Sequence, residues 1–115
     1  MGNSFYSRSI GQQFTFANIA HKTVDGNIVT AVTGKRLRVL GFLFVTGSTA
    51  TPVTFNSKGS SNGTAISAQF QNGANGGASG TPNELGWFET SLGEALTLTS
   101  GTGSTTGVHV VYQEI

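Results

Sequence analysis

A serine in a glycine-rich turn is the first feature of this sequence that could carry chemistry. Residues 59–63 read Gly-Ser-Ser-Asn-Gly, which matches the Gly-x-Ser-x-Gly pattern of hydrolase nucleophiles. That pattern requires a strand-to-helix turn in an α/β sheet, followed along the chain by an acid and a histidine. Here the neighbouring residues predict short β-strands, and 115 residues are few for that fold. We therefore expect an ordinary turn at 59–63.

The two histidines do not show the spacing of a metal site. His21 and His109 lie far apart, and neither belongs to a His-x-His or His-x-x-x-His pair. His109 alternates with valines, so it should face away from the apolar side of its strand. The chain has no cysteine, which excludes thiolate sites and disulfides.

Three glutamates spaced by five residues, Glu84, Glu89 and Glu94, are the other candidate. Paired carboxylates can bind calcium or act as acid and base. No Asp/Asn-rich ligand loop accompanies them, so we expect a structural role, such as pairing with Arg36 or Arg38 or capping a turn. The sequence thus predicts no catalytic residue, metal site, cofactor or small-molecule substrate, and a protein that is not an enzyme.

Charge and hydropathy exclude several partner classes. Only 10% of the residues are charged, against about 25% in an ordinary soluble domain, and the net charge is +1. Basic residues cluster only at Lys35-Arg36-x-Arg38, a weak footprint for nucleic acid. No apolar run approaches the roughly 20 residues that span a bilayer. We expect a soluble chain, made in the cytoplasm, that covers its low-charge surface by association with other subunits.

Apolar periodicity predicts an all-β fold of about eight strands, an antiparallel β-sandwich of jelly-roll type. The longest run, residues 36–46, is apolar on both faces, which predicts a central strand covered by the core on one side and by a partner or arm on the other. Alternation assigns Leu37, Val39, Leu43 and Val45 to one face and Leu40, Phe42 and Phe44 to the other. Residues 64–71 alternate as one half-buried strand, and the Gly- and Asn-rich residues 71–84 predict a long loop.

Residues 85–99 predict a closing hairpin. Trp87–Thr90 fits one strand, Ser91–Gly93 a turn, and Glu94–Thr99 a second strand. The hairpin should hold the core together through side chains turned inward: Trp87 or Phe88, with Leu96 and Leu98.

The N-terminal residues differ from the rest in pattern. Residues 1–24 predict an arm with a short strand at Gln13–Phe16, and residues 25–115 predict the sandwich domain. The aromatic residues of this arm are candidates for contact with a neighbouring subunit, as are two arginines at the start of the central strand. These candidates are Phe5, Tyr6, Phe14, Phe16, Arg36 and Arg38.

The order of motifs resembles a known family. Residues 34–40, 53–57, 86–98 and 107–114 follow one another as they do in small virion structural proteins of tailed bacteriophages. The most specific element is Gly-Trp-Phe-Glu-Thr-x-x-Gly-Glu-Ala-Leu at residues 86–96, and the resemblance covers residues 27–115.

This resemblance implies a β-sandwich that serves as a structural subunit of the particle. The main expectation is a capsid decoration (cement) protein, homotrimeric, on the head exterior of the virion. It would bind the major capsid protein, with the N-terminal aromatic residues as the anchor. Two alternatives are a tail- or fibre-associated subunit and a lectin-like glycan-binding module that uses Trp87 and the loop over residues 71–84.

Overall fold

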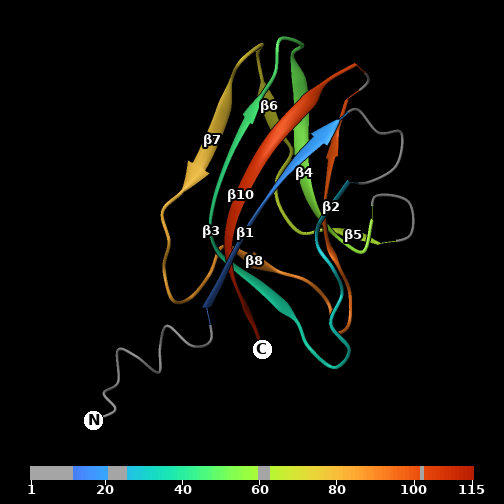
Figure 1. The fold of residues 1–115 in the computed structure, drawn as a ribbon, viewed down its shortest axis with the longest axis vertical. Helices are drawn as coiled ribbons and strands as arrows, with labels where there is room; N and C mark the ends of the chain where they lie inside the picture. The colour runs from blue at the N-terminus through green and yellow to red at the C-terminus, as the bar shows by residue number, and fades with distance from the viewer. Residues whose placement is uncertain (1–11, 21–25, 60–62, 102) are drawn as a thin grey trace.

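The computed structural model describes residues 12–20, 26–59, 63–101 and 103–115. Within these ranges it has ten β-strands and no helix, arranged as two antiparallel sheets that pack against each other (Figure 1). In chain order the strands are β1 (Gln12–Ala20), β2 (Gly26–Val29), β3 (Leu37–Thr46), β4 (Thr51–Ser57), β5 (Thr64–Ala65), β6 (Phe70–Asn72), β7 (Gly77–Gly80), β8 (Phe88–Glu89), β9 (Leu96–Ser100) and β10 (Thr105–Glu114).

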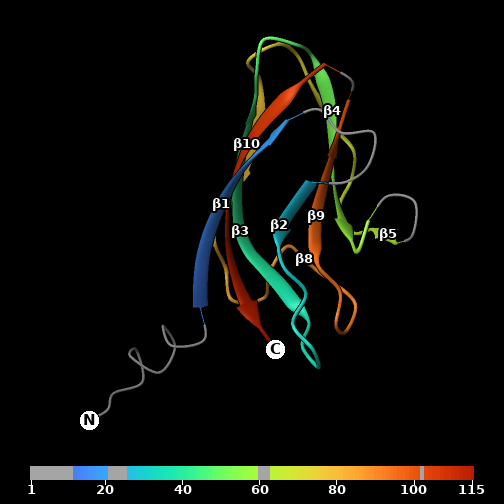
Figure 2. The ribbon, with the colours of Figure 1, turned by 45° about the vertical axis from the view of Figure 1, so that its right-hand side comes forward.

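The chain distributes its strands between the two layers. The first sheet has the order β1-β10-β3-β7, with β8 also paired to β3. The second has the order β2-β9-β4-β5, with β6 also paired to β4. Figure 2 shows β1, β10 and β3 in one layer, with β2, β9 and β4 beside it. The predicted all-β antiparallel sandwich is therefore confirmed.

The strand count exceeds the predicted eight for two local reasons. Residues 64–71 do not form one strand, because the chain leaves the sheet after Ala65 and returns at Phe70. In the gap the Ser67 hydroxyl accepts a hydrogen bond from the Phe55 amide, at 2.9 Å, in place of a backbone partner. The predicted loop over 71–84 also contains β7, whose Gly77 lies so close to the Phe44 carbonyl that a side chain would overlap it.

Apolar side chains from both sheets fill the space between them. Phe44 and Phe55 are fully buried and face each other across the two layers, with ring centroids 6.0 Å apart. Phe42, Phe70 and Phe88 extend this aromatic cluster toward one side of the sandwich. Burial of so much aromatic surface is the main driving force for joining the sheets.

The predicted 85–99 hairpin is wrong. β8 pairs with β3 in the first sheet, whereas β9 pairs with β4 and β2 in the second, so residues 90–95 cross between the layers. Ser57 fixes the crossing: its hydroxyl donates to Glu94 Oε1, at 2.6 Å, and accepts from the Ser91 amide, at 2.9 Å. The turn residues suited a hairpin, but the buried leucines of β9 pair along β4 instead.

The predicted division of faces in β3 is also wrong, because the strand contains a bulge. Val111 of β10 pairs with Gly41 and the next residue, Tyr112, pairs with Val39, which leaves Leu40 as the extra residue. The bulge puts Leu37 and Val39 on the same inward face as Phe42 and Phe44. Leu43 and Val45 consequently face outward.

The N-terminal segment contributes a full strand to the sandwich. β1 pairs with β10 over nine consecutive residues, and the short strand predicted at Gln13–Phe16 lies inside it. Residues 1–11 and 21–25 lie outside the described residues, and with them His21 and the predicted contacts Phe5 and Tyr6.

Candidate functional site

The outward face of the first sheet carries large apolar side chains in contact with solvent. Phe14 of β1 is 62% exposed, and Leu43 and Val45 of β3 are 47% and 49% exposed. Alternation along β3 sends Leu43 and Val45 away from the core, because the neighbouring residues Phe42, Phe44 and Thr46 are buried. A soluble domain usually places polar residues there, so this face is a candidate interaction site.

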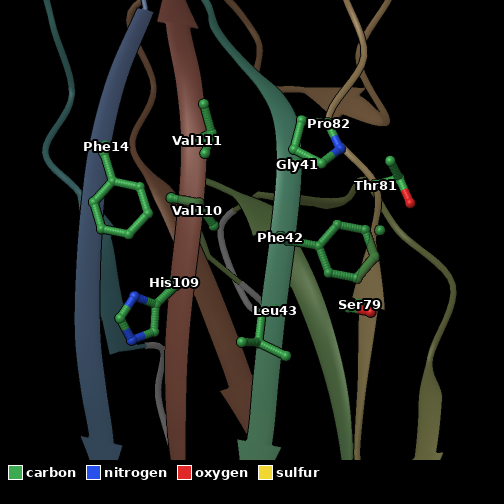
Figure 3. Close-up of a pocket in the computed structure, with 11 residues that line it drawn as sticks. Phe14, Gly41, Phe42, Leu43, Ser79, Thr81, Pro82, His109, Val110 and Val111 are labelled. Atoms are coloured by element: carbon green, nitrogen blue, oxygen red, sulfur yellow. The ribbon is translucent and has the colours of Figure 1, made fainter.

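Strand register aligns this face in two rows. Phe14 pairs with Val111, which pairs with Gly41, and in the next row His109 pairs with Leu43, which pairs with Ser79. Figure 3 shows Phe14, His109 and Leu43 on three neighbouring strands, with the Pro82 ring beside Gly41.

In the first row, Gly41 contributes no side chain to the outward face. Pro82 lies over it, and a β-carbon added at Gly41 would stand 2.7 Å from Pro82 Cγ. We name the resulting depression, about 450 Å³ in volume, the outer groove. Its lining includes Phe14, Gly41, Leu43, Ser79, Thr81, Pro82, His109 and Val111.

The outer groove has few polar side chains, and no Asp, Glu, Lys or Arg lines it. His109 stacks obliquely on Phe14, with ring centroids 5.5 Å apart, and Ser79 supplies a hydroxyl. His109 is exposed, as its alternation with valines predicted. The groove therefore suits an uncharged or apolar partner surface rather than a charged ligand.

The predicted contact residues do not all gather at this groove. Phe14 lines the outer groove. Arg38 lies near the start of β3, where its Nε donates to Glu89 Oε1 at 3.0 Å. This is one of the ion pairs expected for Glu89. Arg36 is exposed just before β3. For Phe16 only the backbone is described, opposite His109.

A second depression, the side groove, opens between the two sheets and holds about 550 Å³. Its lining is rich in aromatic side chains from both layers: Phe42, Phe70, Trp87 and Phe88, together with Ile66, Ser67, Ala78 and Ser79. Trp87 is 49% exposed at its edge, so its predicted place in the core is wrong. The indole Nε1 donates to the Thr81 carbonyl at 2.8 Å, and this bond holds the ring at the surface. Of the other predicted core residues, Phe88 is partly buried and Leu96 and Leu98 are fully buried.

Ionisable groups add little chemistry to either groove. Among the residues that the structure describes, no three His, Asp or Glu side chains gather as metal ligands would. Burial raises the pKa of the Tyr112 phenol above 10.0, and the Glu114 carboxylate raises it further. In the described ranges, no helix is long and apolar enough to cross a membrane.

The sequence predicted that both faces of the strand at residues 36–46 are apolar. It did not predict that Leu43 and Val45 lie on the outward face. The bulge at Leu40 shifts the alternation, and the position of Pro82 over Gly41 depends on contacts between distant segments. A glycine within an otherwise apolar strand was the available signal, since it often marks a bulge or a close approach of another segment.

Comparison with protein-family models, curated proteins and solved structures gives no match to this chain.

Proposed function

We propose that this chain is a bacteriophage virion structural protein, a capsid decoration protein that attaches to the major capsid protein through the outer groove. The observation that carries the proposal is the apolar outward face of the first sheet, where Phe14, Leu43 and Val45 are 47–62% exposed. The motif order at residues 34–114 supports the family, and the homotrimer is the oligomer that the resemblance implies.

The chemistry of this face fits permanent attachment to protein. Interface cores are depleted in charge and enriched in aromatic residues, and the outer groove combines Phe14 with aliphatic side chains and no charged group. A partner that inserts an apolar side chain into the outer groove would gain contact with Phe14, Leu43 and Pro82 together. Such contacts, repeated over a capsid, would hold neighbouring capsomers together.

We propose further that the sandwich is of jelly-roll type. Strand order supports this proposal, since β1, β2, β3 and β4 alternate between the sheets and the first and last strands are neighbours. Jelly rolls occur both in viral capsid proteins and in lectins, so this fold is an analogy that agrees with two functions.

Antibody labelling of the virion tests the location. An antibody raised against the purified chain should label the heads of particles from the bacteriophage that encodes it. Labelling confined to tails or fibres would support the tail-associated alternative instead. Particles that carry none of this chain by immunoblot would overturn a virion role.

Re-addition of purified protein tests the surface. Particles that lack the protein should recover normal occupancy and heat resistance with wild-type chain but not with Leu43→Lys, which places a charge in the outer groove. Lys58→Glu, on an exposed residue at the end of β4, is the matched control and should bind normally. Equal occupancy by Leu43→Lys would exclude this groove as the attachment surface.

A lectin-like glycan-binding module remains the second candidate, favoured by the side groove. The Trp87 side chain lines the side groove and is 49% exposed. The hydrogen bond from its Nε1 to the Thr81 carbonyl fixes the orientation of the ring. An exposed aromatic ring beside hydroxyl groups can stack on a sugar, and Ser67 and Ser79 line the same groove.

A glycan array tests this candidate. The wild-type chain should bind a defined set of glycans, and Trp87→Ala should lose that binding while its β-sheet circular dichroism is unchanged. Leu85→Ala, at an exposed neighbouring residue, is the control and should bind like the wild type. An array without binding would leave no support for the glycan function.

A further inference from the structure

The four margins of the two sheets differ in length. In the second sheet the margins are β2, with four residues and a register shift, and the short strands β5 and β6. The first sheet ends on one side at β7 and β8, with four and two residues. Its other margin is β1, a strand of nine residues in unbroken register with β10. Figure 2 shows β1 along the outside of this layer.

β1 lacks the features that usually prevent edge strands from pairing. Natural edges are blunted by short length, by a bulge, by proline or by charged side chains. The sequence of β1, Gln-Gln-Phe-Thr-Phe-Ala-Asn-Ile-Ala, contains no proline and no charge. Of the described strands only β10 pairs with β1, and β2, although near it, pairs with β9.

Phe14 adds an apolar contact at the same margin. At 62% it is more exposed than Leu43 and Val45 on the same face, and it lies on the last strand of that sheet. A second strand beside β1 would cover it, because neighbouring strands lie about 4.8 Å apart and side chains of one face then touch.

We propose that β1 pairs antiparallel with β1 of a second copy of this chain, joining the two first sheets into one continuous sheet. In such an isologous contact both copies use the same surface, the edge of β1. Once two copies have paired, neither has this edge left, so the assembly stops at a dimer. Main-chain hydrogen bonds along β1 and burial of both Phe14 rings would stabilise the pair. The inference predicts a dimer in solution, where the family resemblance implied a trimer. It rests on the edge position of β1 and not on the proposed function, although both use Phe14.

Sedimentation equilibrium tests the oligomer. The wild-type chain should show twice the monomer mass of 11.9 kDa. Phe14→Lys should raise the dimer dissociation constant by about tenfold or more, because it replaces the apolar ring by a charged side chain on the edge that the second copy covers. Leu43→Lys is the control, on the same face but two strands from the edge, and should remain dimeric.

A single-cysteine scan tests the geometry, because the chain has no cysteine and any disulfide must join two copies. If both joined sheets keep the same face outward, the two-fold axis is perpendicular to the sheet. One residue of β1 then lies directly opposite the same residue of the second copy. Cysteines placed one at a time from Gln12 to Ala20 should therefore cross-link strongly at one position and weakly beside it, since a disulfide needs Cα atoms about 4.4–6.8 Å apart. Leu43→Cys should not cross-link.

The sedimentation results can contradict the proposed dimer in separate ways. A monomer at every concentration, or a trimer that Phe14→Lys does not dissociate, would overturn the β1 pairing. A dimer that Leu43→Lys dissociates while Phe14→Lys does not would assign the contact to the sheet face instead. Attachment to particles is measured separately, so loss of the dimer with normal head labelling would leave the decoration role standing.

Discussion

Pro82 lies directly over Gly41, with the proline ring in the place that a side chain at position 41 would occupy. Two segments that are 41 residues apart in sequence thus meet where the central strand β3 has a bulge. The Asn83 amide adds to this contact by donating to the Leu40 carbonyl at 3.0 Å. The outer groove exists because Gly41 leaves room for this arrangement.

Replacement of Gly41 by alanine should destabilise the fold. The added methyl group would stand 3.0 Å from the Pro82 Cα as well as 2.7 Å from Cγ, so the backbone of the loop must move. We expect a loss of about 1–3 kcal/mol in the free energy of unfolding, measured by urea denaturation. Gly73→Ala is the control, since no atom lies within 4 Å of its added β-carbon. Equal stability of the two variants would contradict the contact.

Leu98 should be essential to the core, although the neighbouring hairpin prediction was wrong. It is fully buried in β9, and Leu98→Ala should cost about 2–5 kcal/mol because it leaves a cavity between the sheets. Leu92→Ala, on the exposed crossing, should change stability by less than about 0.5 kcal/mol. Thermal or urea denaturation of both variants measures the difference, and a similar effect of both would place Leu98 outside the core.

Ser57 should hold the crossing between the sheets. Its hydroxyl bonds to both Glu94 and the Ser91 amide, so Ser57→Ala would leave two partly buried groups without this partner. We expect a loss of about 1–3 kcal/mol, and faster hydrogen exchange at the Ser91 amide. Ser91→Ala keeps that amide and is the matched control. An unchanged exchange rate at Ser91 in Ser57→Ala would show that the bond does not form in solution.

Stability should fall in alkaline solution partly through Tyr112. Burial and Glu114 raise the pKa of its phenol in the folded state above 10.0, so the unfolded chain loses this proton first. The Tyr112 contribution to stability is therefore complete below about pH 10 and is lost as the pH rises through the folded pKa. Urea denaturation from about pH 8 to 11 should give a steeper fall for the wild type than for Tyr112→Phe. Parallel curves would contradict a raised pKa.

The layer architecture was predictable from sequence because it depends on local alternation. Val108 and Val110 alternate with His109, and this pattern predicted the strand and the exposed histidine correctly. Strand partners were not predictable in the same way. Residues 88–89 and 96–100 are close in sequence, yet each pairs with a distant strand in a different sheet.

The outer groove was predicted only in part, because its lining residues come from strands that are distant in sequence. Phe14 was predicted only as a contact residue of the arm and is exposed in the outer groove, but Leu43 and Val45 were grouped with the buried Leu37 and Val39. A one-residue bulge reverses every side chain beyond it, and no residue in the sequence marks its position except Gly41. The hairpin prediction offered Trp87 or Phe88 as the inward side chain; Phe88 packs against the core, whereas the Trp87 indole N–H donates to the Thr81 carbonyl at the surface.

The pairing of β1 with β10 also sets the order in which the protein can assemble during synthesis. These strands occupy residues 12–20 and 105–114, so the residues between them must be synthesised before β1 can meet its partner. The central strand β3 waits equally for β10, which fills the place between them. Pairing over such distances in sequence slows folding, because a long loop must close before any contact is gained. The nascent chain therefore carries an uncharged β1 without its sheet partner until residues 105–114 have been made, and such an unpaired strand is exposed to aggregation during synthesis.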